Sequence, residues 1–470
     1  MLIVKMTHTR MTKIRDLAAC LFLLAMATSA FAQEPPDEFE PASSDPSEAT
    51  ETKEEGEAAA RLREAINENL IPDRPGEAPA PPEEDETTIE PGPPEEAVDP
   101  EEARAEEWYD KFAAQADRLQ RLPERIPFLA GKDWLHFGRI EFEGARFDSG
   151  VLEDDSGFNF RSLRGGLIRQ VSEPLLIKLE IDLTDGDSNF TDLYGRYNTR
   201  IGMFTLGNQK IAQTLVNQTS RLSRTFMEEA LPADAFGLGR RLGVGWDFRL
   251  PRVGAHLTAF GPDLNDDIGK FGYGLRAHAN PTLSKLNMVH LGASAVQEQM
   301  DRDARFRAYP ESRVTDTRLV DTGRVEDVDT QSIFGLELAA ARKSMSFRSE
   351  LFHARWDLKN GETRDFDGYY LQVNKALTGE SFQYAQGKFL RLRPENRRGA
   401  WEVGLRYSHV DLRDGDVDGG RQNNTSLALN WYAPGQQLRL MANLVYVDAD
   451  TSDGGRETPW YFQLRAQLHW

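Results

Sequence analysis

The feature that most constrains this chain is a two-residue alternation of apolar and polar side chains, which begins near Trp134 and continues to the last residue, Trp470. In the terminal segment 459–470 (PWYFQLRAQLHW), every even position from 460 onward is apolar, and the odd positions are mostly polar. Successive side chains of a β-strand point to opposite faces, so this period predicts a strand with one apolar face.

The alternation recurs in segments of about the nine to eleven residues that cross a bilayer as a tilted strand. The clearest are 136–147, 175–183, 240–250, 272–280, 289–297, 399–412, 425–432 and 438–447. Weaker candidates such as 190–197, 332–341 and 345–356 bring the expected number to about sixteen strands.

The intervals between these segments alternate in length. Short ones such as VSEP follow long ones such as DSGVLEDDSG, and the sequence DLRDGDVDGGRQ (411–422) is expected to be a long loop. Short turns at one end and long loops at the other are typical of outer-membrane barrels. One interval, 378–398, is long where a short turn is expected.

A soluble β-sandwich also alternates, but its bulky apolar residues point inward. Here many segments alternate apolar residues with Arg, Asp, Glu and Gln, which fits a polar wall around a water-filled lumen and an apolar wall against lipid. No stretch after residue 32 approaches the roughly 20 apolar residues of a membrane helix. We therefore predict an all-β transmembrane barrel of about 16 antiparallel strands over residues 134–470.

The N-terminus has the pattern of a secretory signal peptide over residues 1–32. Two basic residues precede an apolar run at 17–26, and Ala30-Phe31-Ala32 provides small residues at the expected cleavage site. The only cysteine, Cys20, lies inside this segment, so the mature chain is expected to contain none. The sequence LAAC opens the apolar run instead of following it, which argues against a lipoprotein.

The acidity of the chain belongs to its N-terminal part. Residues 134–470 carry 42 Lys and Arg against 45 Asp and Glu, whereas residues 1–133 carry 14 against 31. Residues 33–100 contain 13 of the 24 prolines, which predicts a disordered acidic Pro-rich arm, expected in the periplasm. Residues 101–133 are predicted to form a short amphipathic helix and a connector.

Several stretches resemble the phosphate-selective porin family, the O and P porins of the bacterial outer membrane. They are TRIGMFTLGNQKI (199–211), SRTFMEEALPADAFGLGRRLGVGWDF (223–248), RFRAYPESRVTDTRLVDTG (305–323), DGYYLQVNKALTGESFQYA (367–385) and GAWEVGLRYSHVDL (399–412). The resemblance implies a sixteen-stranded barrel, usually a homotrimer, with a long third loop (208–239) folded into the pore. A C-terminal aromatic residue also resembles the signal that the outer-membrane assembly machinery reads.

Eight basic residues are the candidates for pore lining and anion contact. Strand parity places five of them toward the lumen, and the other three belong to the third loop or its start. They are Arg196, Arg241, Arg276, Arg406 and Arg465 on strands, and Lys210, Arg221 and Arg224 at the loop. Arg161 and Arg164 are three residues apart, so without a bulge only one of them is expected inside.

Acidic residues share the same predicted face, which keeps a hydrated wall of mixed charge open as an alternative to an anion-selective wall. They are Glu180, Asp182, Asp192, Asp247 and Glu402. The family's phosphate selectivity is associated with pore arginines and clustered lysines, but only 8 of the 42 basic residues after position 133 are lysines. Family resemblance therefore does not establish phosphate as the solute.

The sequence thus predicts a porin that forms a water-filled channel for passive diffusion of small solutes, with anions such as phosphate favoured. The alternative is a barrel that mainly anchors the acidic arm for contact with peptidoglycan or periplasmic proteins. The histidines are scattered and no nucleophile motif is present, so we do not expect an enzyme. We expect no cofactor, metal or nucleic acid either. The sequence DGDVDGG (414–420) resembles the start of a calcium-binding loop, but Thr425 stands at the twelfth position, where such a loop has Glu.

Overall fold

The structure is a computed structural model that describes residues 134–470, except 149, 185–188, 251, 265–270, 283–286 and 301–302. The expected signal peptide (1–32), acidic arm (33–100) and amphipathic helix with its connector (101–133) lie outside the described residues. No helix within the described ranges is long and apolar enough to cross a membrane.

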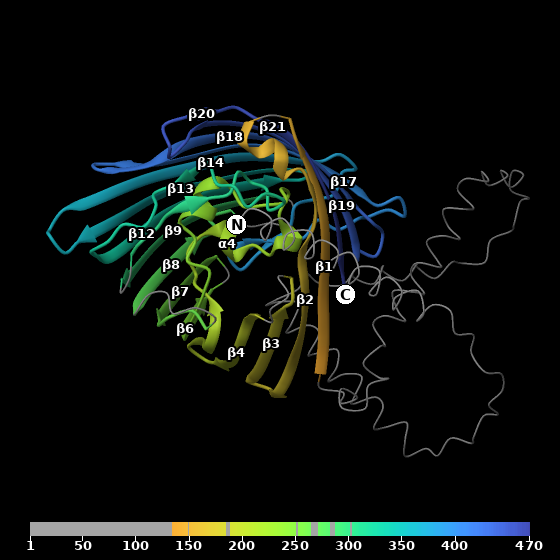
Figure 1. Ribbon diagram of the computed structural model, residues 1–470. Coiled ribbons are helices and arrows are strands. Elements are labelled where there is room, and N and C mark those ends of the chain that lie inside the picture. Colours follow the sequence, from red (N-terminus) through yellow and green to blue (C-terminus); the bar gives the residue numbers. More distant parts are fainter. Residues whose placement is uncertain are drawn as a thin grey trace, which may run out of the picture. The chain divides into compact units, whose positions relative to one another are not determined.

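Sixteen long strands, each antiparallel to its neighbours, form a closed barrel (Figure 1), which confirms the predicted fold class. They are β1 (Trp134–Phe147), β2 (Gly157–Ser172), β3 (Leu175–Asp182), β4 (Asn189–Thr199), β5 (Gly202–Lys210), β6 (Arg240–Arg249), β7 (Val253–Phe260), β8 (Gly272–Ala279), β9 (Asn287–Gln299), β12 (Val328–Arg342), β13 (Met345–Leu358), β14 (Thr363–Ala376), β17 (Ala400–Asp414), β18 (Val417–Tyr432), β19 (Leu438–Asp450) and β21 (Trp460–His469).

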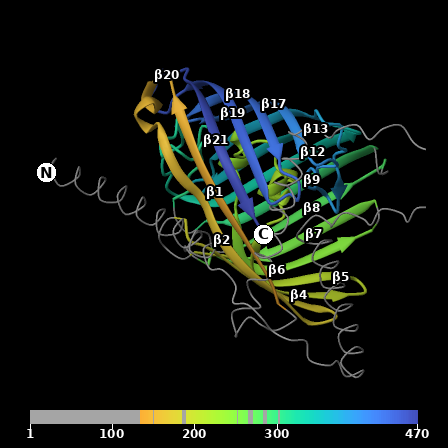
Figure 2. The ribbon, with the colours of Figure 1, turned by 90° about the vertical axis from the view of Figure 1, so that its right-hand side faces the viewer.

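The barrel closes where the first and last strands pair. Residues Arg139–Phe147 of β1 pair with Tyr461–His469 of β21. Beyond the strand, the backbone N–H of Trp470 donates to the carbonyl of Gly138 (3.2 Å), and the N–H of Gly138 donates to that of Trp470 (3.1 Å). Figure 2 shows β1 and β21 side by side, with the C-terminus at this seam.

The two faces of β21 differ as the alternation predicts. Trp460 and Leu464 are about half exposed on the outer surface (50% and 51%), whereas Gln463 and Arg465 on the alternate face are buried (0% and 2%). The same contrast recurs around the barrel, where the exposed large side chains are mostly leucine, valine and aromatic residues. An apolar outer belt and a polar inner wall are the pattern of a barrel solvated by lipid.

One predicted outer loop is wrong. The stretch 411–422 is a continuation of two strands, because β17 runs to Asp414 and β18 starts at Val417. Leu412 and Val417 are buried in the main apolar cluster, so inward packing extends the hairpin beyond the point where the charges suggest a loop.

Among the described residues, no group of three or more His, Cys, Asp or Glu is arranged to hold a metal ion.

Three connections fold into the lumen. Loop 3 (211–239), which joins β5 to β6, contains α4 (Leu215–Gln218), the 3-10 turn η3 (Arg221–Ser223) and α5 (Leu231–Ala235). Loop 5 (300–327), which joins β9 to β12, contains β10 (Arg307–Ala308) and β11 (Val320–Asp321). A short helical turn, η2 (Gly150–Asp155), and a short strand, β20 (Arg456–Glu457), complete the elements at the long-loop end.

The third connection is the long interval between β14 and β17, which we call the inward turn (377–399). It carries the small hairpin β15 (Tyr384–Ala385) and β16 (Lys388–Phe389). Phe382, Phe389 and Leu392 are buried together with Leu215 of loop 3. Its excess length therefore provides a segment that enters the barrel from the short-turn end and meets loop 3.

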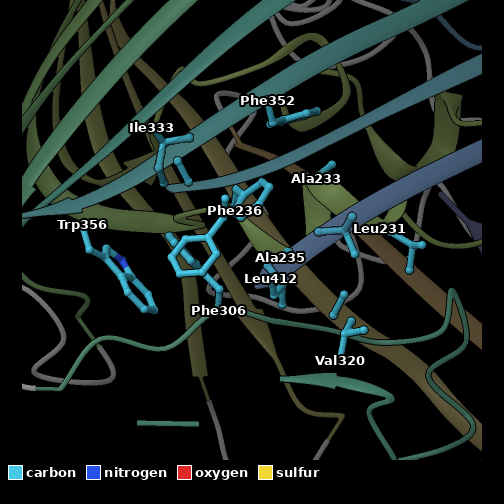
Figure 3. Close-up of a cluster of buried hydrophobic side chains, with 14 of the residues drawn as sticks. Leu231, Ala233, Ala235, Phe236, Phe306, Val320, Ile333, Phe352, Trp356 and Leu412 are labelled. Carbon is cyan, nitrogen blue, oxygen red and sulfur yellow. The ribbon is translucent and has the colours of Figure 1, made fainter. Parts of the chain in front are cut away.

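Loops 3 and 5 pack against one side of the inner wall. In the largest buried cluster (Figure 3), Phe306 of loop 5 stacks on Trp356 of β13 at 4.6 Å between ring centroids. Phe306 also contacts Phe236 of loop 3 edge-on at 5.0 Å. Burying these rings holds both loops against β12–β18, and a cavity remains beside the inner faces of β1–β7.

The seam generates a prediction. The Trp470 ring lies against Gly138, where any side chain would collide with it. We expect Trp470→Ala to reduce the folded fraction, because it removes an aromatic contact at the strand pair that closes the barrel. Trp460→Ala, at the other end of β21, is the matched control. Equal folded fractions on a semi-native gel, with and without heating, would contradict this role.

Candidate functional site

A cavity of about 370 Å³ lies between loop 3 and the inner wall of β1–β7. Its charged lining is predominantly basic, with ten cationic side chains and five carboxylates. The cations are Arg139, Arg164, Lys178, Arg196, Lys210, Arg221, Arg224, Arg240, Arg249 and Lys388, and the carboxylates are Glu180, Asp192, Glu229, Asp234 and Asp247. Three separate parts of the chain supply them, namely the strands, loop 3 and the inward turn.

On the barrel wall, several cations share few carboxylates. Asp192 of β4 accepts from Lys178 Nζ (2.6 Å) and from Arg240 Nε (2.6 Å). Glu180 lies 2.9 Å from Lys178 Nζ and 3.4 Å from the guanidinium of Arg164. These two carboxylates are therefore shared among three cations, Lys178, Arg240 and Arg164.

Arg164 faces the lumen, and so does Arg161, contrary to the expectation that only one would. Arg164 Nε lies 2.6 Å from Asp182 of β3, and Arg161 Nε lies 2.7 Å from Glu228 of loop 3. The pairing of β1 with β2 shifts register between Glu141 and Phe142. This bulge changes the parity of β2 and brings both guanidinium groups inside.

Loop 3 places cations opposite the wall. Arg221 Nη1 lies 3.0 Å from Glu141 of β1, and Arg224 Nη2 lies 2.6 Å from Glu229. Burial alone would raise the pKa of Glu229, but Arg224, with Lys210 and Arg221, outweighs it and holds that pKa below its ordinary value. The loop carboxylate therefore stays ionised beside its arginine.

Two cations of the lining pair with no carboxylate of the described residues. Lys210 Nζ donates to the carbonyl of Asn217 at 3.0 Å. Arg196 Nε donates to Thr205 Oγ1 at 3.3 Å, and its guanidinium lies 4.9 Å from the ring centroid of Tyr194. Neutral groups therefore orient both side chains.

The eight sequence candidates therefore divide into two sets. Arg196, Lys210, Arg221 and Arg224 line the cavity. The other four point inward but lie outside the lining, where they hold the loops. Arg241 pairs with Glu298 at 3.3 Å, and Arg406 pairs with Glu311 at 2.6 Å. Arg276 pairs with Glu337 at 2.7 Å and donates to the carbonyl of Gly387 at 2.9 Å. Arg465 contacts Glu143 and Glu228.

Two wall carboxylates that the sequence analysis did not single out for this role anchor loop 3. Glu350 of β13 accepts from the backbone N–H groups of Leu215 (2.8 Å) and Val216 (3.0 Å) at the start of α4. Glu402 of β17 accepts from Thr225 Oγ1 at 2.8 Å. An acidic residue at an inward strand position is the only sequence signal, and it does not distinguish an anchor from a pore-lining group.

The inward turn contributes Lys388, which the sequence analysis did not identify. Arg276 holds the hairpin through the carbonyl of Gly387, and Arg249 Nη1 donates to Gln386 Oε1 at 2.6 Å. Burial, followed by the nearby charges of Arg249 and Arg196, lowers the pKa of Lys388 to about 8, although Asp247 opposes the shift. Lys388 therefore changes its charge within about one pH unit of neutrality.

Comparison with known proteins agrees with this architecture. Residues 138–470 match the family described as phosphate-selective porin O and P. The chain belongs to this family. An uncharacterized protein of Caulobacter vibrioides is 29% identical over 336 residues, which is 66% of this chain and 68% of that protein. Porin O of Pseudomonas aeruginosa is 30% identical over 152 residues, or 29% of this chain and 34% of Porin O, so the match spans about a third of that relative.

Among solved structures, OprB of Pseudomonas putida has a TM-score of 0.50 and 10% identity, covering 74% of this chain and 97% of that chain. At this identity the likeness concerns the fold alone. Family membership and the closed barrel together support an outer-membrane channel.

The anchoring of loop 3 generates a prediction. Glu350→Ala removes the acceptor of two backbone N–H groups, and a typical hydrogen bond contributes about 0.5–1.5 kcal/mol. We therefore expect larger and noisier single-channel currents, since α4 is no longer held against β13. Leu351→Ala, on the lipid side of the same strand, is the control. Currents of Glu350→Ala that match those of the parent protein would show that this contact does not position the loop.

Proposed function

We propose that this porin conducts small anions by passive diffusion through the cavity beside loop 3. The observation that supports the proposal is the twofold excess of cations over carboxylates in the lining. An unpaired unit charge attracts a counter-ion at 4 Å by about 1 kcal/mol in bulk water, and by more beside a protein surface. The same charges raise the free energy of a cation in the passage.

The cations extend along the direction of transport. Lys210 and Arg240 lie where β5 and β6 meet loop 3, and Arg249 lies at the opposite end of β6, beside the short turns. Ten strand residues span roughly 30 Å, less the tilt of the strand. An anion that moves through the cavity therefore meets positive charge at successive levels instead of one tight site, which favours release as well as entry.

Seven of the ten lining cations are arginines. A guanidinium stays charged at any working pH and presents a planar pair of donors that matches the oxygens of phosphate or carboxylate. We therefore propose small oxyanions, phosphate among them, as the preferred solutes. The five carboxylates of the lining would moderate binding and keep the passage hydrated.

The alternative function, a barrel that mainly anchors the acidic arm, draws on the length and charge of residues 33–133. The two proposals differ in one measurement, because an anchor needs no ion conductance across a planar bilayer. A homotrimer, recognition of the C-terminal strand by the assembly machinery and a periplasmic location of the arm remain part of the proposal that the family resemblance implies.

Removing positive charge from loop 3 would test anion preference. In Arg221→Gln/Arg224→Gln, Glu141 and Glu229 lose their loop 3 partners, so two positive charges disappear from one side of the cavity. At about 1 kcal/mol per contact, each loss corresponds to roughly a fivefold change in relative permeability. We expect the reversal potential in asymmetric KCl to move toward the potassium potential. The double variant Arg355→Gln/Arg413→Gln, with the same charge change on exposed strand ends, is the control, and equal shifts in the two would refute the assignment.

The pKa of Lys388 generates a second test. The ammonium group is charged below its pKa and neutral above it, so positive charge in the cavity decreases as the pH rises through about 8. We expect the chloride preference to fall between pH 7 and pH 9. Lys388→Arg should keep the preference constant over that range, and Lys388→Met should show the weaker preference at both pH values. A pH response that survives in Lys388→Arg would assign the titration to another group.

A further inference from the structure

The short-turn end of the barrel carries an excess of exposed basic side chains, which we call the basic rim. Five lie in turns and three at adjoining strand ends, and only two exposed carboxylates accompany them among the described residues of these turns and strand ends. The basic residues are Arg200, Arg252, Lys343, Arg397 and Arg398 in turns and Arg169, Arg342 and Lys375 at strand ends; the carboxylates are Glu173 and Glu395.

The opposite end of the barrel has a different charge. The tip of the β17–β18 hairpin exposes Asp416 and Asp418, and the loop between β19 and β21 exposes Asp453. At the long-loop end exposed carboxylates stand beside exposed cations such as Arg305 and Lys359, so a strongly acidic segment is attracted mainly to the short-turn end. Rim cations that have hydrogen-bond or ion-pair partners remain charged. The difference between the two ends therefore depends on the total exposed charge at each end and not on any single unpaired residue.

The chain itself contains such a segment, and it joins the barrel at the basic rim. Residues 77–102 contain 11 Asp and Glu and no Lys or Arg. β1 begins at Trp134, which pairs with Arg169 of β2, and Arg169 is itself part of the rim. The 31 residues between this segment and β1 would reach about 45 Å even if all were helical, so the connector is long enough for contact with much of the rim.

We propose that the acidic segment 77–102 of this chain docks on the basic rim at the short-turn end of the barrel. The contacts are those between exposed ions, each contributing at most about 1 kcal/mol, so the interaction depends on their number. Eleven carboxylates tethered beside eight cations experience a high effective concentration, which compensates for weak individual pairs. Docking concerns the outer face of the turns and is independent of which ion the channel conducts.

The absence of cysteine from residues 33–470 provides a clean measurement. Spin labels on Ala97→Cys in the acidic segment and Asn198→Cys beside the rim report their separation in the full-length protein, in a neutral detergent. We expect a narrow short-distance population at low ionic strength, which is lost at 1 M KCl, where the screening length falls to about 3 Å. A distance distribution that does not respond to salt would overturn the proposal.

A charge-reversal series assigns the contact. Replacing the five turn residues Arg200, Arg252, Lys343, Arg397 and Arg398 by Glu should abolish the short-distance population. Replacing the 11 acidic residues of segment 77–102 by Lys in that background should restore it. The matched control replaces five exposed basic residues of the long-loop end by Glu and should change nothing; these are Arg305, Arg324, Lys359, Arg413 and Arg456.

Anionic lipid is the competing occupant of the rim. If vesicles of phosphatidylglycerol abolish the short-distance population that is present in phosphatidylcholine, lipid headgroups hold the rim and the proposal fails. If the population persists in both, docking of the segment is supported. Ion selectivity of the same variants is recorded separately, so a failure of docking can be distinguished from a failure of the proposed anion channel.

Discussion

Pairing of β1 with β21 is the constraint on which the rest of the structure depends. In a lipid environment an unpaired strand edge leaves a row of backbone N–H and C=O groups without partners, and each such group costs several kcal/mol. The register from Arg139 to Phe147 against Tyr461 to His469 removes both edges at once. It also aligns Glu143 with Arg465, whose guanidinium donates to the carbonyl of Met227 and to the carboxylate of Glu228 in loop 3. Closure of the barrel and placement of the loop are therefore linked through the same pair of strands.

The interior follows from that closure, because a sixteen-stranded ring encloses more space than its own side chains fill. Loops 3 and 5 occupy one side through the rings of Phe236, Phe306 and Trp356, and the inward turn enters from the opposite end through Phe389. What remains open is the space along β1–β7. The passage is thus defined by which part of the wall the apolar clusters leave uncovered, and its charge is that of the uncovered strands.

Most of the fold could be predicted from the sequence, because strand parity is a local property. The two faces of β21 agree with the alternation of residues 460–470. The prediction failed where tertiary contacts override the local pattern. The charged stretch 411–422 remains in strands because Leu412 and Val417 pack inward, and Arg161 and Arg164 share a face because of a bulge in the β1–β2 ladder. Lys388 could not have been placed from the sequence, since its position depends on the folding of the inward turn.

The candidate site illustrates a limit of parity itself. Arg196 and Arg276 both point inward, yet Arg196 is oriented by a threonine hydroxyl and retains its charge in the cavity, whereas Arg276 is neutralised by Glu337 and holds the inward turn through Gly387. Direction toward the lumen is thus necessary for a role in conduction and insufficient for it. A buried arginine with a bidentate carboxylate partner mainly positions a loop, because its field is cancelled at short range. The arginines and lysines that share carboxylates or contact only neutral groups are the ones whose field extends into the passage. The fully paired arginines, such as Arg276, hold the loops that carry some of these cations.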